Sequence, residues 1–271
     1  MTLISEVRVV TLGPLGYFLG LEVTHSDASL FLSQAKYAHD ILSRTGLLDS
    51  KPVAIPLANT NTFLSKGVPF HDHTIYYLQL VKRILRYVKG TISFGLTFSK
   101  PTSTTIVGYF DADWARCIET RRSTYGYSIY LGGNLVSWSA KKQPTFSRSS
   151  CEFEYRAMAN TAAEIIWLTH LLRELHALPM ARPTLLCDNK SAIFLSQNLV
   201  SHKRAKHIDI DYHFMRELVS SGRFYTKFVP SNLQVADIFT KILSRPLFEK
   251  LRGLLHIGPP PVRLTGGKSI T

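Results

Sequence analysis

Two aspartates follow stretches of sequence that are typical of β-strands. Asp111 comes directly after the β-rich run 105–110, and Asp188 comes directly after the short apolar run 183–187. Because ligands of α/β sheets collect at the carboxyl ends of the strands, we expect both carboxylates at one edge of a sheet. Each residue also has a plainer explanation, since an Asp after a strand often caps the helix that follows.

A third acid, Glu154, lies near the start of a long helix expected over residues 150–176. Extending the apolar stripe of this helix backwards by three and four residues reaches Glu154, which therefore faces the core. A carboxylate on a buried face is costly unless it is paired or binds a metal. Glu152 lies about 200° round the helix and is expected to face solvent, and Glu164 lies one residue off the stripe. The stripe consists of Ala157, Met158, Thr161, Ile165, Leu168, Leu172 and Leu175.

The fourth candidate is Asp237, in an apolar segment expected to be helical over residues 233–241, where partial burial is predicted. Carboxylates from two strand ends and two helices would form the oxygen-rich cage that Mg²⁺ prefers. Two such ions about 4 Å apart can activate water and stabilise the leaving oxygen in phosphodiester hydrolysis. We therefore predict a site for two Mg²⁺ ions, with Mn²⁺ as a substitute.

Residues 104–258 contain the elements that must position these acids. Strands are expected at 105–110, 125–131, 135–139, 183–187 and 224–229, and helices at 150–176, 189–198, 208–220 and 233–241. The sequence Gly132-Gly133-Asn134 is typical of a tight hairpin turn. Hairpin-linked strands followed by strands joined through helices predict an α/β domain with a mixed five-stranded sheet and flanking helices.

The rest of the chain is organised differently. Residues 1–100 predict a small α+β segment, with strands at 17–23 and 29–32, helices at 34–45 and 78–89, and a loop over 49–74. Residues 259–271 contain three consecutive prolines and two adjacent glycines, so we expect a flexible tail.

The composition indicates a polyanionic partner. The chain of 271 residues has 32 Lys and Arg against 19 Asp and Glu, a net charge of +13, which attracts nucleic acid by steering and counterion release. Three scattered cysteines without C-x-x-C spacing favour a reducing, intracellular compartment. We found no signal peptide and no run of 18 apolar residues, so no membrane association is expected. The predicted phosphate ligands are Arg121, Arg122, Ser123, Thr124, Lys141, Lys142, Arg148 and Ser149.

Residues 108–257 resemble the ribonuclease H domain that ends the Pol polyprotein of copia-type LTR retrotransposons. The main matching motifs are Asp111-Ala112-Asp113-Trp114-Ala115, Glu152-Phe153-Glu154-Tyr155-Arg156-Ala157, Cys187-Asp188-Asn189 and Ala236-Asp237-Ile238-Phe239-Thr240-Lys241. Further matches lie within 120–124, 137–144, 147–150 and 206–214. The resemblance implies a ribonuclease H-like fold and a metal site that cleaves the RNA strand of an RNA–DNA hybrid. Its acids would be Asp111, Glu154, Asp188 and Asp237, with Asp113 as a second choice for Asp111.

Residues 14–100 resemble the region that follows the polymerase palm in the same polyproteins. The resemblance implies a thumb and connection region, shortened between Tyr77 and Leu78, so that residues 1–100 would be a truncated remnant. The chain contains no Tyr-x-Asp-Asp motif. DNA synthesis would therefore need a reverse transcriptase palm region from another chain.

Two other functions remain open at this point. A catalytically inactive retrotransposon remnant could still bind nucleic acid through its basic surface. An integrase-like strand transferase is disfavoured because Glu217 follows Asp188 too closely for the closing acid of that site.

Overall fold

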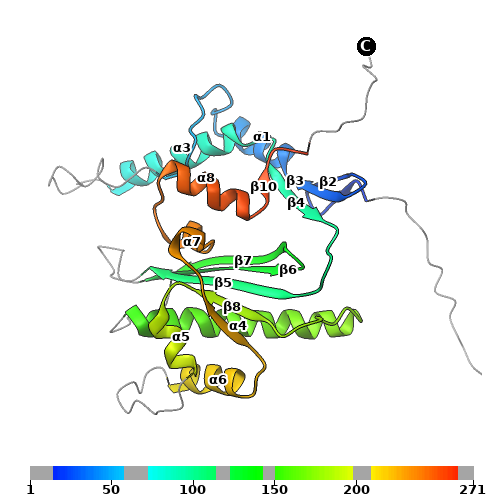
Figure 1. Cartoon of the computed structure of the whole chain (residues 1–271). Coiled ribbons are helices and arrows are strands. Elements are labelled where there is room, and N and C mark those ends of the chain that lie inside the picture. The colour runs from blue at the N-terminus through cyan, green and yellow to red at the C-terminus, as the bar shows by residue number, and fades with distance from the viewer. Residues whose placement is uncertain (1–14, 58–72, 114–122, 143–149, 198–208, 262–271) are drawn as a thin grey trace, which may run out of the picture.

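The computed structural model describes residues 15–57, 73–113, 123–142, 150–197 and 209–261. These residues form two five-stranded sheets, with strand orders β1-β2-β3-β4-β10 and β7-β6-β5-β8-β9. Figure 1 shows the second sheet between the long helix α4 on one side and the short helices α7 and α8 on the other. No helix in the described parts of the chain combines the length and the apolar character needed to cross a bilayer.

The second sheet carries the predicted strands in mixed pairing. β5 (Ile106–Asp113), β6 (Thr124–Leu131) and β7 (Asn134–Lys142) are antiparallel neighbours, whereas β8 (Thr184–Cys187) and β9 (Tyr225–Phe228) extend the sheet in parallel from β5. Gly132 (φ +56°) and Gly133 (φ +84°) make the two-residue turn between β6 and β7, a conformation that favours glycine. The expected mixed five-stranded sheet of an α/β domain is confirmed.

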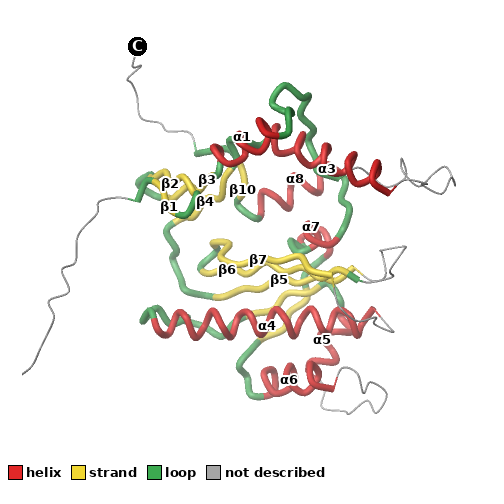
Figure 2. The backbone as a smooth tube through the Cα atoms, turned by 180° about the vertical axis from the view of Figure 1, so that it is seen from behind, coloured by secondary structure: helices red, strands yellow, loops and turns green. Residues whose placement is uncertain are grey.

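Three helices cover one face of this sheet (Figure 2). α4 (Ser150–Glu174) packs against β5, and α6 (Asp209–Ser220) packs against α4 and α5 (Lys190–Gln197). The predicted apolar stripe of α4 is buried from Ala157 to Leu172, but its last member was wrong, because Leu175 is 64% exposed and lies just beyond the end of the helix. The main core thus lies between α4 and the sheet.

The segment after β9 differs from the helix expected over 233–241, and this prediction was wrong in extent. The chain forms a 3₁₀ turn at Ser231–Leu233 and then a single helical turn, α7 (Asp237–Thr240). Between them, the fully buried Gln234 has an extended backbone (φ −74°, ψ 94°), and its Nε2 donates to the carbonyl of Phe110 on β5 at 3.0 Å. This bond to the sheet replaces the continuous helix, because a buried amide must find partners.

The first sheet is completed by the C-terminal end of the chain. It contains β1 (Tyr17–Phe18), β2 (Leu21–His25), β3 (Ser29–Ser33), β4 (Gly95–Ser99) and β10 (Ile257–Gly258). β10 pairs with β4, although residues 257–258 were expected within the second segment. Helix α8 (Arg245–Leu254), which precedes β10, was not predicted from the sequence.

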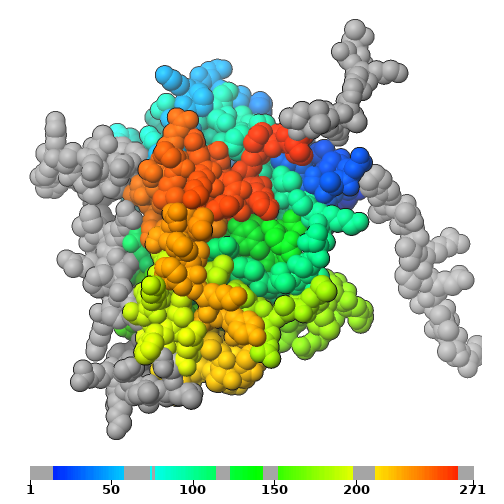
Figure 3. Space-filling model, in the orientation of Figure 1, coloured from blue at the N-terminus to red at the C-terminus, as the bar shows by residue number. Residues whose placement is uncertain are grey.

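The remaining helices lie on the first sheet's side of the molecule. They are α1 (Ala35–Arg44) and α3 (His73–Gly90), which contact each other. In Figure 3 the orange and red residues of α8 and β10 lie against the blue and cyan N-terminal segment. Arg252 of α8 contributes to this contact, since its guanidinium lies 4.8 Å from the ring centroid of Phe94.

A second, smaller core joins the two sheets. It contains Tyr130, Leu135, Val235 and Leu255, all at most 7% exposed. The Asn134 side chain accepts from the Ser99 amide at 2.8 Å and donates to the Ser99 carbonyl at 2.9 Å. The N-terminal segment therefore packs on the face of the second sheet opposite α4.

Candidate metal and nucleic-acid site

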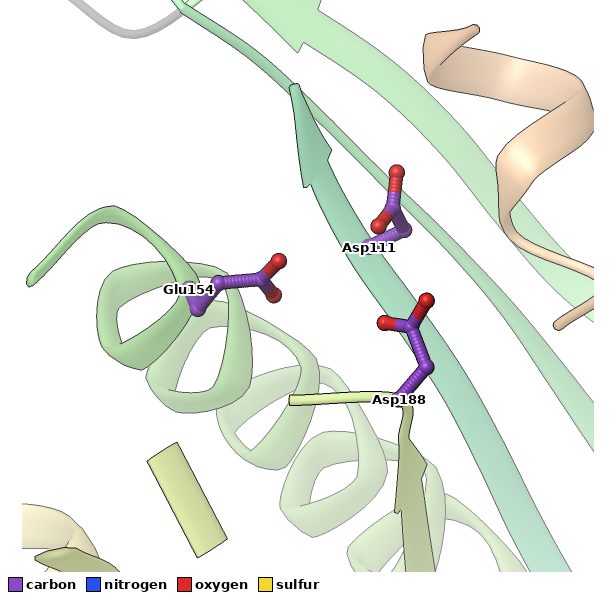
Figure 4. Close-up of side chains that lie close together, drawn as sticks. All are labelled: Asp111, Glu154 and Asp188. Atoms are coloured by element: carbon purple, nitrogen blue, oxygen red, sulfur yellow. The ribbon is translucent and has the colours of Figure 1, made fainter. Parts of the chain in front are cut away.

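Three of the predicted acids meet at one edge of the second sheet. Asp111 on β5, Glu154 on α4 and Asp188 just after β8 each place a carboxylate oxygen within 4.8 Å of the others. Figure 4 shows their carboxyl groups pointing toward a common space. β8 pairs with β5 only along Val107–Tyr109. Asp111 therefore lies two residues past the part of β5 that pairs with β8, and Asp188 directly follows the last residue of β8.

Burial gives this cluster a strong preference for a positive partner. Asp111 is 1% exposed and Glu154 is 7% exposed. Burial, with the negative charges of Asp111 and Asp188, raises the pKa of Glu154 to about 9. Burial likewise raises the pKa of Asp111. Because all three donors are carboxylate oxygens, the residues present fit a hard divalent cation such as Mg²⁺.

Asp237 belongs to the same region but is held differently. It is 4% exposed and is not among the three acids that lie within 4.8 Å of one another. Lys241 connects it to the cluster, with Nζ 2.7 Å from Asp237 Oδ1 and 3.1 Å from Asp111 Oδ1. Burial and the charge of Asp111 raise the pKa of Asp237 to about 7. Burial lowers the pKa of Lys241, but the two carboxylates outweigh it and raise the pKa above its ordinary value.

Several neighbours of the acids were not predicted as site residues. Thr240 Oγ1 donates a hydrogen bond to Asp111 Oδ2, and Ser231 Oγ donates to Asp188 Oδ2 at 3.0 Å. The spacing of four residues between Asp237 and Lys241 could have predicted their ion pair on a helical turn. No comparable local pattern points to Thr240 or Ser231.

Of the two acids near the start of α4, Glu154 lies as its helical position predicted and Glu152 does not. The predicted burial of Glu154 is confirmed. The prediction that Glu152 faces solvent was wrong, because its side chain is 12% exposed and lies 3.9 Å from Arg156 Nη2. Strand β5 also runs past Asp111 to Asp113, since its pairing with β6 continues to Thr124. Asp113 is partly exposed and lies outside the three-acid cluster.

An open cleft of about 530 Å³ adjoins the acids. Phe228 is 47% exposed beside it, and Lys190 Nζ lies 5.0 Å from the Phe228 ring centroid. The cleft is lined by Glu154, Asp188, Asn189, Lys190, Phe228 and Lys241. A smaller hollow of about 270 Å³ near Tyr17 and Lys36 has only Asp40 as an acid in its lining.

The predicted phosphate ligands lie partly within the described residues. Lys141 and Lys142 are exposed at the end of β7, and Lys142 pairs in register with Thr124, which in turn pairs with Asp113. This end of the sheet is the one that carries the acids. Ser123 is only 3% exposed, which leaves little surface for a phosphate. Arg121, Arg122, Arg148 and Ser149 lie outside the described residues.

No family model matches the chain, but sequence relatives are clear. The retrovirus-related Pol polyprotein from transposon RE1 of Arabidopsis thaliana is 37% identical over 282 residues, covering 91% of this chain. That of transposon TNT 1-94 of Nicotiana tabacum is 33% identical and covers 90%. An uncharacterised mitochondrial protein of Arabidopsis thaliana is 41% identical, and the match covers 82% of that protein. The chain belongs to the family of retrovirus-related Pol polyproteins of copia-type transposons.

This Pol-family chain spans 19% of the length of the RE1 polyprotein and 22% of that of TNT 1-94. The 282 aligned positions with RE1 exceed the 271 residues of the chain. The relative therefore carries residues in the aligned region that this chain lacks.

Solved structures with some similarity include ribonuclease H domains. The N-terminal ribonuclease H domain of rv2228c from Mycobacterium tuberculosis covers 56% of this chain and 98% of its own, at 15% identity and a TM-score of 0.39. Prototype foamy virus protease-reverse transcriptase covers 87% of this chain and 38% of its own, at 8% identity and a TM-score of 0.31. Neither likeness bears on function.

A glycine under α7 should be essential for the position of Asp237 and Lys241. A Cβ at Gly126 on β6 would meet Phe239 Cβ at 2.5 Å and Thr240 Cγ2 at 3.1 Å. Gly126→Ala is therefore expected to push α7 from the sheet and to lower the free energy of unfolding by about 1–3 kcal/mol, the usual cost of overpacking. Urea denaturation measures this loss.

Gly253→Ala is the matched control, because nothing lies within 4 Å of a Cβ at that helical position. It should be neutral or stabilising by up to about 1 kcal/mol. Equal stability of Gly126→Ala and the unaltered protein would show that α7 is not packed tightly on β6.

Proposed function

We propose that this chain is a metal-dependent endonuclease that hydrolyses the RNA strand of RNA–DNA hybrids. The observation that carries the proposal is the cluster of the buried Asp111 and Glu154 with the partly buried Asp188, within 4.8 Å of one another at the edge of the sheet. Membership of the Pol family supports the substrate class, since copying an RNA template into DNA produces such hybrids. The chain lacks a Tyr-x-Asp-Asp motif, so no polymerase activity is proposed for it.

The acids of the cluster would hold a divalent metal ion beside the scissile phosphate. Asp111, Glu154 and Asp188 would hold the metal, with Asp237 at the edge of the site. When bound, the metal would activate the attacking water and stabilise the leaving oxygen. Thr240 and Ser231 fix the Asp111 and Asp188 carboxylates through hydrogen bonds, a supporting role usually needed for metal ligands.

Other residues would hold the hybrid. The exposed Lys141 and Lys142 offer positive charge to backbone phosphates, which position a duplex without reading its sequence. At the cleft, the face of Phe228 and the ammonium of Lys190 offer a stacking surface and a phosphate contact next to the acids. These contacts would place one strand across the cluster.

The test uses hybrids labelled on either the RNA or the DNA strand. With Mg²⁺, the unaltered chain should shorten the RNA label and leave the DNA label intact. Removing the metal with EDTA, or replacing Asp188 with Asn, should stop cleavage. RNA loss that persists in the Asp188→Asn protein would indicate a contaminating nuclease and count against the proposal.

A second candidate function is hybrid binding without hydrolysis. It is favoured by the ammonium of Lys241, which lies 3.1 Å from a site carboxylate, and by the net charge of +13. Equal inertness of the unaltered and Asp188→Asn proteins, with hybrid binding retained by both, would support this function over the first.

Phe228 should contribute to hybrid affinity if the cleft holds substrate. Stacking on an aromatic side chain is worth roughly 1–3 kcal/mol per base, so Phe228→Ala should raise the Kd for a hybrid roughly 5-fold to 150-fold. Fluorescence anisotropy in EDTA measures binding without cleavage.

The control for this variant is Tyr225→Ala. Tyr225 is similarly exposed, at 48%, but lies at the other end of β9, opposite Thr184. Its Kd should stay within about two-fold of the unaltered value, because a surface contact outside the cleft contributes little. Equal weakening by both variants would place the substrate elsewhere.

A further inference from the structure

The amino group of Lys241 occupies a position between two site carboxylates. Nζ lies 3.1 Å from Asp111 Oδ1 and 2.7 Å from Asp237 Oδ1, and the side chain is 29% exposed. Both contacts are within hydrogen-bond distance. The ammonium thus links Asp237 to the cluster that Asp111 shares with Glu154 and Asp188.

The backbone fixes this arrangement. The Lys241 amide donates to the Asp237 carbonyl at 2.9 Å, which closes the single turn of α7. Behind the turn, a Cβ at Gly126 would already be too close to Phe239, so α7 is seated tightly on β6. The base of the Lys241 side chain is therefore held next to Asp237, although the ammonium itself ends a flexible stem.

Asp111 has its two oxygens engaged in different ways. Oδ1 accepts from Lys241, and Oδ2 accepts from Thr240. A carboxylate has about four lone-pair positions in total, so about two remain, which is enough for a metal ion shared with Glu154 and Asp188. A second divalent ion bridging Asp111 and Asp237 would have to occupy the position of the ammonium, and like charges at such distances repel strongly.

We propose that Lys241 takes the place of a second metal ion. The site binds one divalent cation through Asp111, Glu154 and Asp188, and the Lys241 ammonium neutralises Asp111 and Asp237 where a second cation would otherwise lie. This inference rests on the proposed function in so far as it takes the three-acid cluster as the metal site. It replaces the two-ion site that the sequence predicted.

The test counts bound ions rather than activity. The metal-free chain is titrated with Mn²⁺, and free Mn²⁺ is measured by electron paramagnetic resonance. The count is made with and without a nuclease-resistant 2′-O-methyl RNA–DNA hybrid, after subtraction of the ions that the hybrid binds alone. The unaltered chain should bind one ion under both conditions.

Three variants separate the charge of Lys241 from other effects. Lys241→Met should bind two ions, because the space between Asp111 and Asp237 becomes available to a cation. Lys241→Arg retains the positive charge and should bind one. Lys227→Met removes an equal charge from an exposed position on β9 and should also bind one.

Each outcome distinguishes this inference from the proposed function. Two ions on the unaltered chain, or one ion on a Lys241→Met protein with an unaltered circular dichroism spectrum, would overturn the role of Lys241 alone. If Lys241→Met does not fold, the count on the unaltered chain and on Lys241→Arg still decides, since two ions on either contradicts the inference. A chain that binds no ion overturns the metal site and the proposed function together.

Discussion

Replacing Glu154 with Gln is expected to reduce hybrid cleavage by more than about 100-fold, since even partners of metal ligands cost 10- to 100-fold when removed. Glu154 is 7% exposed and belongs to the three-acid cluster. The amide is nearly the same size as the carboxylate but has no charge to hold a cation. Initial rates with a labelled hybrid at saturating Mg²⁺ measure the effect.

Glu152→Gln is the matched control on the same helix. Glu152 forms a loose pair with Arg156 at 3.9 Å, and helical pairs of this kind contribute about 0.3–0.5 kcal/mol. Its cleavage rate should therefore stay within about two-fold of the unaltered rate, because an energy of about 0.3–0.5 kcal/mol corresponds to a factor of about two in rate. A comparable loss from both substitutions would contradict the assignment of Glu154 to the site.

The thermal stability of the metal-free protein is expected to fall as the pH rises from about 4.5 towards 9. Burial and neighbouring acids raise the pKa of Glu154 from 4.5 to about 9, and that of Asp237 from 3.8 to about 7. The folded state therefore retains protons that the unfolded state releases. The stabilisation is complete below the unfolded pKa values and is lost as the pH passes the folded ones. Lys241 does not cancel this trend. Its pKa is raised in the folded state, so its contribution to the stability of the fold is present at every pH between about 4.5 and 9.

Mg²⁺ should reverse this loss at high pH. A ligand at a hundred times its Kd stabilises by about 2.7 kcal/mol, which corresponds to a rise in Tm of roughly 5–10 °C for a chain of this size. The rise should be larger at pH 8 than at pH 5, because the metal must displace protons from its ligands. Differential scanning calorimetry with EDTA or Mg²⁺ provides both series.

Glu154→Gln again supplies the decisive comparison. An amide does not titrate, so this variant should show a flatter decline of Tm with pH and a smaller response to Mg²⁺, whereas Glu152→Gln should follow the unaltered protein. Identical pH profiles for Glu154→Gln and the unaltered chain would show that Glu154 is not the group that titrates.

Local patterns in the sequence were sufficient for much of the second sheet and for part of the site. The adjacent glycines 132 and 133 have the positive φ angles of the predicted hairpin turn. The apolar stripe of α4 is buried as expected from Ala157 to Leu172, and Glu154 with it. These features depend on turn chemistry and on the 3.6-residue period, which act over a few neighbouring residues.

Contacts between residues far apart in the sequence could not be predicted from local patterns. β10 is only two residues long, and its pairing with β4 joins parts of the chain more than 150 positions apart. Gln234 breaks the expected helix because its side chain bonds to Phe110 on β5. A short pattern cannot show which distant strand offers a free edge or a free carbonyl, so these elements were mispredicted or missed.

The sequence likewise predicted only part of the candidate site. The sequence determined which residues could hold a metal: Asp111 and Asp188 by their positions after apolar runs, Glu154 by its helical face, and all of them with Asp237 by family motif. Only the tertiary structure decided how they are used, since it gathers three acids within 4.8 Å and inserts Lys241 between Asp111 and Asp237. The reason is physical: the position of this ammonium depends on how α7 packs on β6, and that packing involves residues more than a hundred positions apart.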